Sequence, residues 1–235
     1  MKTLTVLLTW LLGLNLPTVF AAAPKDLETE RAQMVAQQLK PRGIRDEAVL
    51  AAMRRVPRHL FVPEDRQEQA YRDTPLPIGY GQTISQPYIV AYMTELIRPR
   101  AGMRILEIGT GSGYQAAVLA EMAVEVFTVE IIEELARWGQ ANLERAGYRG
   151  VRVKRGDGYF GWSEQAPFDA VVVTAAADHI PPPLLEQLKE GGRMVIPVGS
   201  PFLTQRLILV RKEGGKIVTE SLLPVRFVPF TRERP

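Results

Sequence analysis

Three alternating glycines at residues 109, 111 and 113 constrain the fold of this chain more than any other feature. They follow residues 105–108, a short and mostly apolar run that contains Glu107 and is typical of a buried strand. Glycines allow the chain to turn sharply and let a ligand approach the backbone closely. Residues 126–130 form a second such run, which ends in an acid, Glu130. In a βαβ unit these two strand ends are neighbours, so we expect the glycine turn and Glu130 to face one crevice.

An acid at the end of the second strand can accept hydrogen bonds from the hydroxyls of a ribose, which predicts a nucleoside ligand. A dinucleotide-binding loop requires the spacing G-x-G-x-x-G, and its third glycine would fall at Tyr114 in this chain. The observed spacing is G-x-G-x-G, so the third glycine of a dinucleotide-binding loop is absent. A nicotinamide-dependent oxidoreductase remains an alternative enzyme class, disfavoured by Tyr114.

Strand-like and helix-like segments alternate after residue 100, which predicts a single doubly wound α/β domain with a mostly parallel, Rossmann-like sheet. Glu213-Gly214-Gly215-Lys216 is a hairpin signal, so the C-terminal strands should pair antiparallel at an edge of this sheet. The expected strands are residues 104–108, 124–130, 151–155, 170–174, 193–198 and 206–211, and the expected helices are residues 114–122, 132–146 and 183–189.

The chain before the sheet is predicted to form an N-terminal helical extension. A first helix should begin near Asp26 and stop at residues 41–43, Pro-Arg-Gly, and a second should cover residues 46–54 with Asp46 as N-cap. Residues 72–82 are rich in proline and glycine, so we expect an irregular surface segment there. Pro87 then suits the first position of another helix.

Composition excludes several classes of function. The 235 residues fit one domain of ordinary size. The formal net charge of +3 is small and scattered, so a nucleic-acid partner is not expected. The chain has no cysteine and only two histidines, which removes thiolate chemistry and makes a metal site improbable.

Six motifs support a closer identification: residues 81–87, 106–114, 156–158, 168–170, 191–193 and 225–229. Together they resemble the protein-L-isoaspartate O-methyltransferase family, within the class I S-adenosylmethionine-dependent methyltransferases. The likeness extends from about residue 30 to the C-terminus. Its most specific element is Thr-Ile-Ser-Gln-Pro at residues 83–87, which methyltransferases of other classes lack.

The resemblance implies an enzyme that transfers a methyl group from S-adenosylmethionine to the free α-carboxyl of L-isoaspartyl residues in damaged proteins and peptides. We expect no metal, from the composition, and a monomer, although the sequence itself leaves the oligomeric state open. Ser85 is the expected catalytic residue, orienting the substrate carboxylate. The residues expected to bind the cofactor are Thr83, Ile84, Ser85, Gln86, Glu107, Gly109, Gly111, Gly113, Glu130, Asp157, Gly158 and Thr231.

Residues 1–23 resemble a secretory signal peptide and precede a predicted methyltransferase domain at residues 24–235. The cofactor is made in the cytoplasm, which predicts a cytoplasmic protein. A periplasmic protein, or one anchored in the inner membrane through residues 1–23, is the alternative. An exported, non-catalytic binding protein with the same fold is a third hypothesis, which the glycine loop and residues 83–87 oppose.

Overall fold

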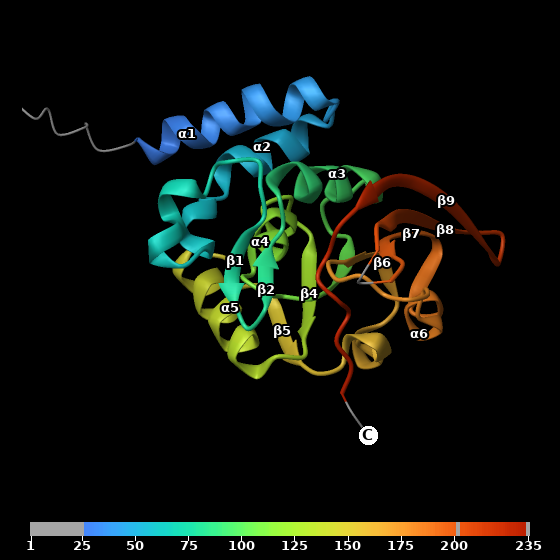
Figure 1. Ribbon diagram of the computed structural model, residues 1–235. Coiled ribbons are helices and arrows are strands. Elements are labelled where there is room, and N and C mark those ends of the chain that lie inside the picture. The colour runs from blue at the N-terminus through green and yellow to red at the C-terminus, as the bar shows by residue number, and fades with distance from the viewer. Residues whose placement is uncertain (1–25, 201–202, 234–235) are drawn as a thin grey trace, which may run out of the picture.

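The computed structural model describes residues 26–200 and 203–233, so the signal-like segment at residues 1–23 lies outside the described residues. The architecture is a central seven-stranded sheet with helices on both faces (Figure 1). The strand order is β5-β4-β3-β6-β7-β8-β9. The strands are β3 (Arg104–Ile108), β4 (Glu125–Glu130), β5 (Arg152–Arg155), β6 (Phe168–Val173), β7 (Leu188–Val198), β8 (Gln205–Glu213) and β9 (Lys216–Val225).

Pairing within the sheet confirms the predicted fold. The strands from β5 to β7 are parallel, whereas β8 and β9 are antiparallel to their neighbours. The predicted hairpin at residues 213–216 joins these last two strands. The chain moves outward from β3 to β5 and then returns to place β6 on the other side of β3. This reversal is a topological switch point, where the loops after the strands separate and leave a crevice for ligands.

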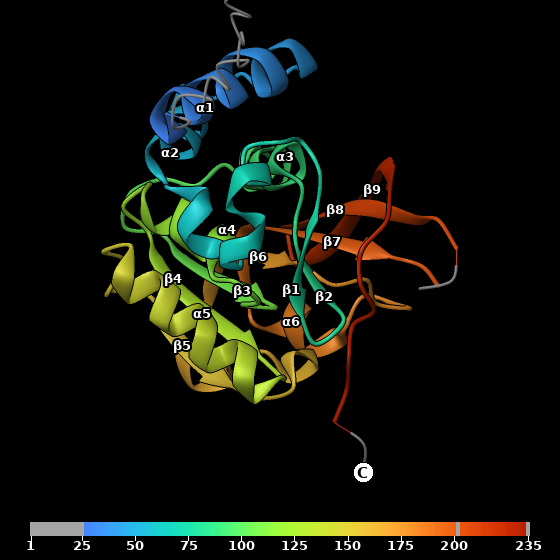
Figure 2. The same cartoon turned by 60° about the vertical axis from the view of Figure 1, so that its left-hand side comes forward.

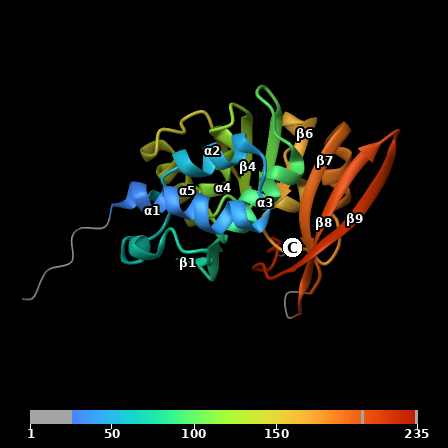
Figure 3. The ribbon, with the colours of Figure 1, turned by 90° about the horizontal axis from the view of Figure 1, so that it is seen from above.

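Helices cover each face because successive strand residues point to opposite sides. On one face Ile105 packs in a large apolar cluster with residues of α2 to α5, and on the other Leu106 packs with Leu184 of α6. Figure 3 shows α1, α2 and α3 gathered on one side of the sheet. The α-helices are α1 (Leu27–Gln33), α2 (Glu47–Arg55), α3 (Pro87–Ile97), α4 (Tyr114–Ala120), α5 (Glu133–Arg145) and α6 (Pro182–Glu186).

The N-terminal extension agrees with the sequence. The α1 helix continues as a π-helical turn, η1 (Met34–Leu39), and ends through the 3-10 turn η2 (Lys40–Arg42) at Gly43, whose φ is 95°. Asp46 caps α2 by accepting hydrogen bonds from two backbone N–H groups. The remaining 3-10 turns are η3 (Arg58–Phe61), η4 (Glu64–Gln69), η5 (Gly158–Phe160) and η6 (Ser163–Gln165). Among the described residues, no helix is both long and apolar enough to cross a membrane.

The prediction for residues 72–82 was wrong, because this segment contains most of a hairpin. The strands β1 (Leu76–Gly79) and β2 (Gln82–Ile84) pair antiparallel (Figure 2). Tyr80 and the glycines on either side of it all have positive φ, which produces the tight turn. Ile78 is buried, and its Cδ1 lies 3.4 Å from the position that a Cβ on Gly111 would take. The proline and glycine content marked the turn but concealed the two short strands.

The bounds of α6 and β7 also differ from the predicted ones. The predicted helix at residues 183–189 ends at Glu186, and β7 begins at Leu188 rather than at Arg193. The register between β6 and β7 shifts after Phe168, which accommodates the extra residues at the start of β7. These differences lie at the amino end of β7, away from the switch point.

Gly139 in α5 allows a test of the packing around the glycine loop. Alanine normally stabilises a helix interior relative to glycine. A Cβ at Gly139 would lie 2.8 Å from the carbonyl oxygen of Gly111 and 3.0 Å from Thr110 Cγ2, however. We expect Gly139→Ala to lower the free energy of unfolding by about 1–3 kcal/mol in chemical denaturation, the usual cost of overpacking.

The matched control is Gly150→Ala, because nothing lies within 4 Å of a Cβ built at Gly150. This control should change the free energy of unfolding by about 0.5 kcal/mol or less. A Gly139→Ala protein as stable as the wild type would contradict the close packing.

Candidate active site

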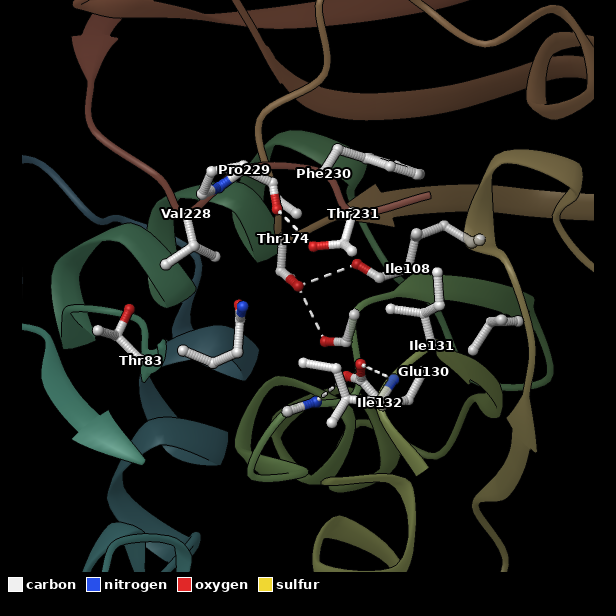
Figure 4. Close-up of a pocket in the computed structure, with 16 residues that line it drawn as sticks. Thr83, Ile108, Glu130, Ile131, Ile132, Thr174, Val228, Pro229, Phe230 and Thr231 are labelled. Atoms are coloured by element: carbon white, nitrogen blue, oxygen red, sulfur yellow. Dashed lines mark hydrogen bonds between the residues drawn. The ribbon is translucent and has the colours of Figure 1, made fainter. Parts of the chain in front are cut away.

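Two adjoining cavities lie at the carboxyl edge of the sheet. The first lies over the ends of β3 and β4, between the glycine loop and the segment that follows β9 (Figure 4). The second lies beside α3, and the two share Thr83, Thr174 and Val228. The first cavity is lined by Gln82, Thr83, Ile108, Gly109, Gly111, Val129, Glu130, Ile131, Ile132, Gly158, Thr174, Ala175, Val228, Pro229, Phe230 and Thr231.

The glycine loop forms the floor of the first cavity. Gly109 and Gly111 have φ values of 97° and 50°, which favour glycine. A Cβ on Gly109 would collide with the hydroxyl of Thr174, which donates hydrogen bonds to the carbonyls of Ile108 and Gly109 at 2.9 Å each. The loop therefore presents bare backbone to the cavity. Gly113 does not line the cavity; its φ of 87° and its contact with α5 give it a packing role.

Glu130 closes one side of this cavity at the end of β4. Its carboxylate accepts a hydrogen bond from the N–H of Gly111 at 2.8 Å and another from the N–H of Ile132 at 3.0 Å. The residue is 6% exposed, so the carboxylate is fixed rather than mobile. Each oxygen keeps acceptor capacity for further donors, because a carboxylate oxygen can accept about two hydrogen bonds. The arrangement suits a pair of ligand hydroxyls.

Glu107 lies beneath the loop in β3 and is fully buried. Neither carboxyl oxygen has a hydrogen-bond partner, although a narrow cleft lined by Ser85, Ser112 and Gln115 reaches it. Burial raises the pKa of Glu107 to about 8, and the nearby Glu130 carboxylate adds to this increase. Ionisation of a buried carboxyl without a partner is costly, and a cationic group bound in the cleft would offset this cost.

Ser85 lies on the wall of the second cavity, immediately before α3. The capping role that a serine could have there belongs instead to Asp73, whose carboxylate accepts a hydrogen bond from the N–H of Tyr88 at 2.9 Å. Gln86 also donates to Asp73, at 2.8 Å. Within the described part of the chain the Ser85 hydroxyl has no hydrogen-bond partner. It is therefore free to bind a ligand in the second cavity.

The other predicted site residues divide between the two cavities. Thr83 lines both, and Ile84 lines the narrow cleft next to Glu107. Gln86 lines only the second cavity. Gly158 lines the first, where a Cβ would collide with Ile108, but Asp157 lines neither. The Asp157 carboxylate is instead paired with Arg232 at 2.8 Å.

Two features of the site were missed from the sequence. Thr174 lies at the junction of the cavities. Its position directly after an apolar strand could have marked it as a site residue from the sequence. Val228, Pro229 and Phe230 form a wall with the predicted Thr231. Their approach depends on contacts with residues far away in the chain, which no local pattern reveals. No group of three or more metal-ligating side chains occurs among residues 26–200 and 203–233.

The buried carboxyl of Glu107 predicts a pH dependence of stability. Its pKa rises from 4.5, the ordinary value that applies to the unfolded chain, to about 8 in the fold. Between these values the folded state holds more protons, so stability decreases as the pH rises. We expect Glu107→Gln to gain stability relative to the wild type across this window, by at most about 1.4 kcal/mol per pH unit.

Urea denaturation of the ligand-free proteins at a series of pH values measures this difference. The control is Glu134→Gln on the exposed face of α5, which should show no such trend. Parallel stability curves for wild type and Glu107→Gln would show that Glu107 is ionised in the fold at neutral pH.

Comparison with known proteins identifies the family. A family model described as protein-L-isoaspartate(D-aspartate) O-methyltransferase matches residues 29–235. A protein-L-isoaspartate O-methyltransferase of Opitutus terrae is 61% identical over 93% of this chain and 94% of its own length. A Gloeobacter violaceus protein of the same name is 58% identical over 86% of this chain and 98% of its own length.

Solved structures agree with these relatives. One named protein-L-isoaspartate O-methyltransferase has a TM-score of 0.77 and 32% identity, covering 85% of this chain and 65% of that chain. A Plasmodium falciparum structure in complex with S-adenosyl-L-homocysteine has a TM-score of 0.76 and 27% identity, covering 86% of this chain and 99% of that chain. The resemblance in the sequence motifs is thus confirmed, and the chain belongs to the protein-L-isoaspartate(D-aspartate) O-methyltransferase family.

Proposed function

We propose that this protein is a repair enzyme that transfers a methyl group from S-adenosylmethionine to the free α-carboxyl of L-isoaspartyl residues in damaged proteins and peptides. The observation that carries the proposal is the junction of the two cavities at Thr83, Thr174 and Val228. One cavity suits a nucleoside, and the other contains a serine hydroxyl without a protein partner. A group bound at this junction is within reach of both sites.

The first cavity fits S-adenosylmethionine. Glu130 would accept hydrogen bonds from the ribose hydroxyls, and the bare backbone of Gly109 and Gly111 would lie against the nucleoside. The orphaned carboxyl of Glu107 offers a partner for the charged amino group of the methionine portion, and ionising Glu107 beside a cation is favourable. Gly158 and Phe230 both line this cavity and would lie beside the adenine ring.

The second cavity fits a carboxylate substrate. Its charged lining side chains are both arginines, Arg42 and Arg226. Arg42 is already paired with Asp73 and stacked 3.5 Å above the ring of Tyr88. Arg226 is exposed and forms no ion pair within the described residues, so it is available to attract an anionic substrate. The Ser85 hydroxyl would then donate a hydrogen bond to the acceptor carboxylate.

The chemistry requires alignment rather than acid–base catalysis. When bound, S-adenosylmethionine supplies an activated methyl group on a positively charged sulfur, which a carboxylate oxygen accepts without prior proton transfer. A carboxylate with a pKa near ~4 is already ionised at neutral pH. Ser85 and the walls of the cavities therefore need only to orient the substrate and exclude water, which can contribute on the order of 7–11 kcal/mol. Methylation of Ser85 itself would give a stable ether and no turnover.

The alternatives are less well supported. Tyr114 occupies the position of the third glycine of a dinucleotide loop; it is buried, packs against Phe61 and lines the narrow cleft beside Glu107. An exported binding protein would not need a free Ser85 hydroxyl next to a nucleoside site. We propose that the protein acts as a monomer in the cytoplasm, where the cofactor is made.

Paired peptides test the proposal, one with an L-isoaspartyl residue and one with the normal aspartyl residue at the same position. With tritium-labelled cofactor, the wild type should label only the isoaspartyl peptide. Ser85→Ala should lower the transfer rate by about 10–100-fold, since a misplaced reactant loses most of the benefit of alignment. Ser163→Ala, an exposed serine far from both cavities, is the matched control and should keep full activity.

Equal labelling of the two peptides would refute the repair assignment. Full activity of Ser85→Ala, or a stable methyl group on Ser85 found by mass spectrometry, would refute only the role of the Ser85 hydroxyl. The repair assignment would stand.

A further inference from the structure

The chain that follows β9 crosses the carboxyl edge of the sheet. We call residues 227–233 the C-terminal strap; in Figure 1 it descends from β9 toward the C-terminus. Its first anchor is Gln205, which is fully buried and accepts a hydrogen bond from the N–H of Phe227 at 2.7 Å. Ala176, just after β6, then donates to the carbonyl of Val228 at 2.9 Å and accepts from the N–H of Phe230 at 2.8 Å. The near end of the strap is thus held by backbone pairing.

The far end is held by the carboxylate of Asp157. The Nε of Arg232 donates to both carboxylate oxygens of Asp157, at 3.1 Å and 2.8 Å. Its guanidinium also stacks on Tyr159, with the Cζ atom 3.7 Å from the ring centroid. The Asp157 side chain is 5% exposed and that of Arg232 is 42% exposed, so an accessible arginine closes over a buried acid. Asp157 further accepts from the N–H groups of Tyr159 at 3.0 Å and of Glu233 at 3.3 Å.

The anchors at Ala176 and at Asp157 lie on opposite sides of the first cavity. Ala176 follows β6 and Asp157 follows β5, and in the sheet β3 and β4 separate these strands. The part of the strap between the anchors supplies Pro229, Phe230 and Thr231 to the cavity wall, as Figure 4 shows. The strap therefore spans the mouth of the cavity, and detachment of its far end would open that mouth.

The contact also bears on the expected role of Asp157. Asp157 was expected from the sequence to bind the cofactor. In the structure both of its oxygens are already used by the strap and by Tyr159. Asp157 is therefore placed to hold the strap.

We propose that Arg232 is a positioning residue for the cofactor: its pairing with Asp157 latches the C-terminal strap over the bound nucleoside and slows its release. This inference rests on the proposed binding of S-adenosylmethionine in the first cavity. The backbone anchors at Ala176 do not depend on charge, whereas the Arg232–Asp157 pair does. Because Arg232 is partly exposed, salt weakens the latch but leaves the other anchors intact.

The test measures the dissociation rate of tritium-labelled S-adenosylhomocysteine from the full chain, chased with an excess of unlabelled ligand. Arg232→Gln should accelerate dissociation by roughly three- to tenfold, the range of a partly exposed charged hydrogen bond. Arg232→Lys keeps the charge and should restore most of the wild-type rate. The control Arg137→Gln removes an equally charged, exposed ion pair on α5 and should leave the rate unchanged.

A second readout separates a latch from a general structural role. Raising the salt concentration should accelerate dissociation from the wild type but have little effect on Arg232→Gln, which has lost the pair. The unfolding temperatures of the two proteins without ligand should be similar.

The outcomes distinguish this inference from the proposed function. Failure of the wild type to bind S-adenosylhomocysteine would refute the proposed function itself. Tight binding with equal dissociation rates for wild type and Arg232→Gln would overturn only the latch, as would an equal acceleration in Arg137→Gln.

Discussion

Close packing around the glycine loop is the constraint on which the whole carboxyl edge of the sheet depends. The loop is enclosed by Thr174, which follows β6, by Gly139 from α5 and by Ile78 from the β1–β2 hairpin. A side chain at Gly109 would collide with Thr174, and one at Gly139 would collide with the loop itself, so this packing requires glycine at both positions. The N–H of Gly111 is thereby fixed on the Glu130 carboxylate, and that contact sets one wall of the first cavity.

Burial at this edge gives each polar group a defined task. The Glu130 carboxylate accepts hydrogen bonds from two backbone N–H groups. The Glu107 carboxyl is buried without a hydrogen-bond partner and can accept one from a ligand. Asp73 takes over the capping of α3, which releases the Ser85 hydroxyl toward the second cavity. A chain that provides no general base at the junction is well matched to a substrate that is already ionised. The enzyme's contribution is then the fixed orientation of two reactants and the exclusion of water.

The sequence predicted the parts of this structure that local patterns govern. Residues 104–108 form β3 as expected, and α3 begins at Pro87, because apolar periodicity and proline geometry act over a few residues. The β1–β2 hairpin was missed because its strands are too short to show a period. The pairing of Arg232 with Asp157 could not be foreseen either, since the two residues are 75 positions apart and meet only when β9 directs the chain back across the sheet.

The most direct test of the central claim is a structure of the protein with S-adenosylhomocysteine and an isoaspartyl peptide bound together. The two cavities predict that the ribose hydroxyls lie within hydrogen-bonding distance of Glu130 and that the peptide carboxylate contacts the Ser85 hydroxyl. The sulfur should lie at the junction formed by Thr83, Thr174 and Val228. A nucleoside bound away from Glu130, or a peptide carboxylate that does not reach Ser85, would contradict the account.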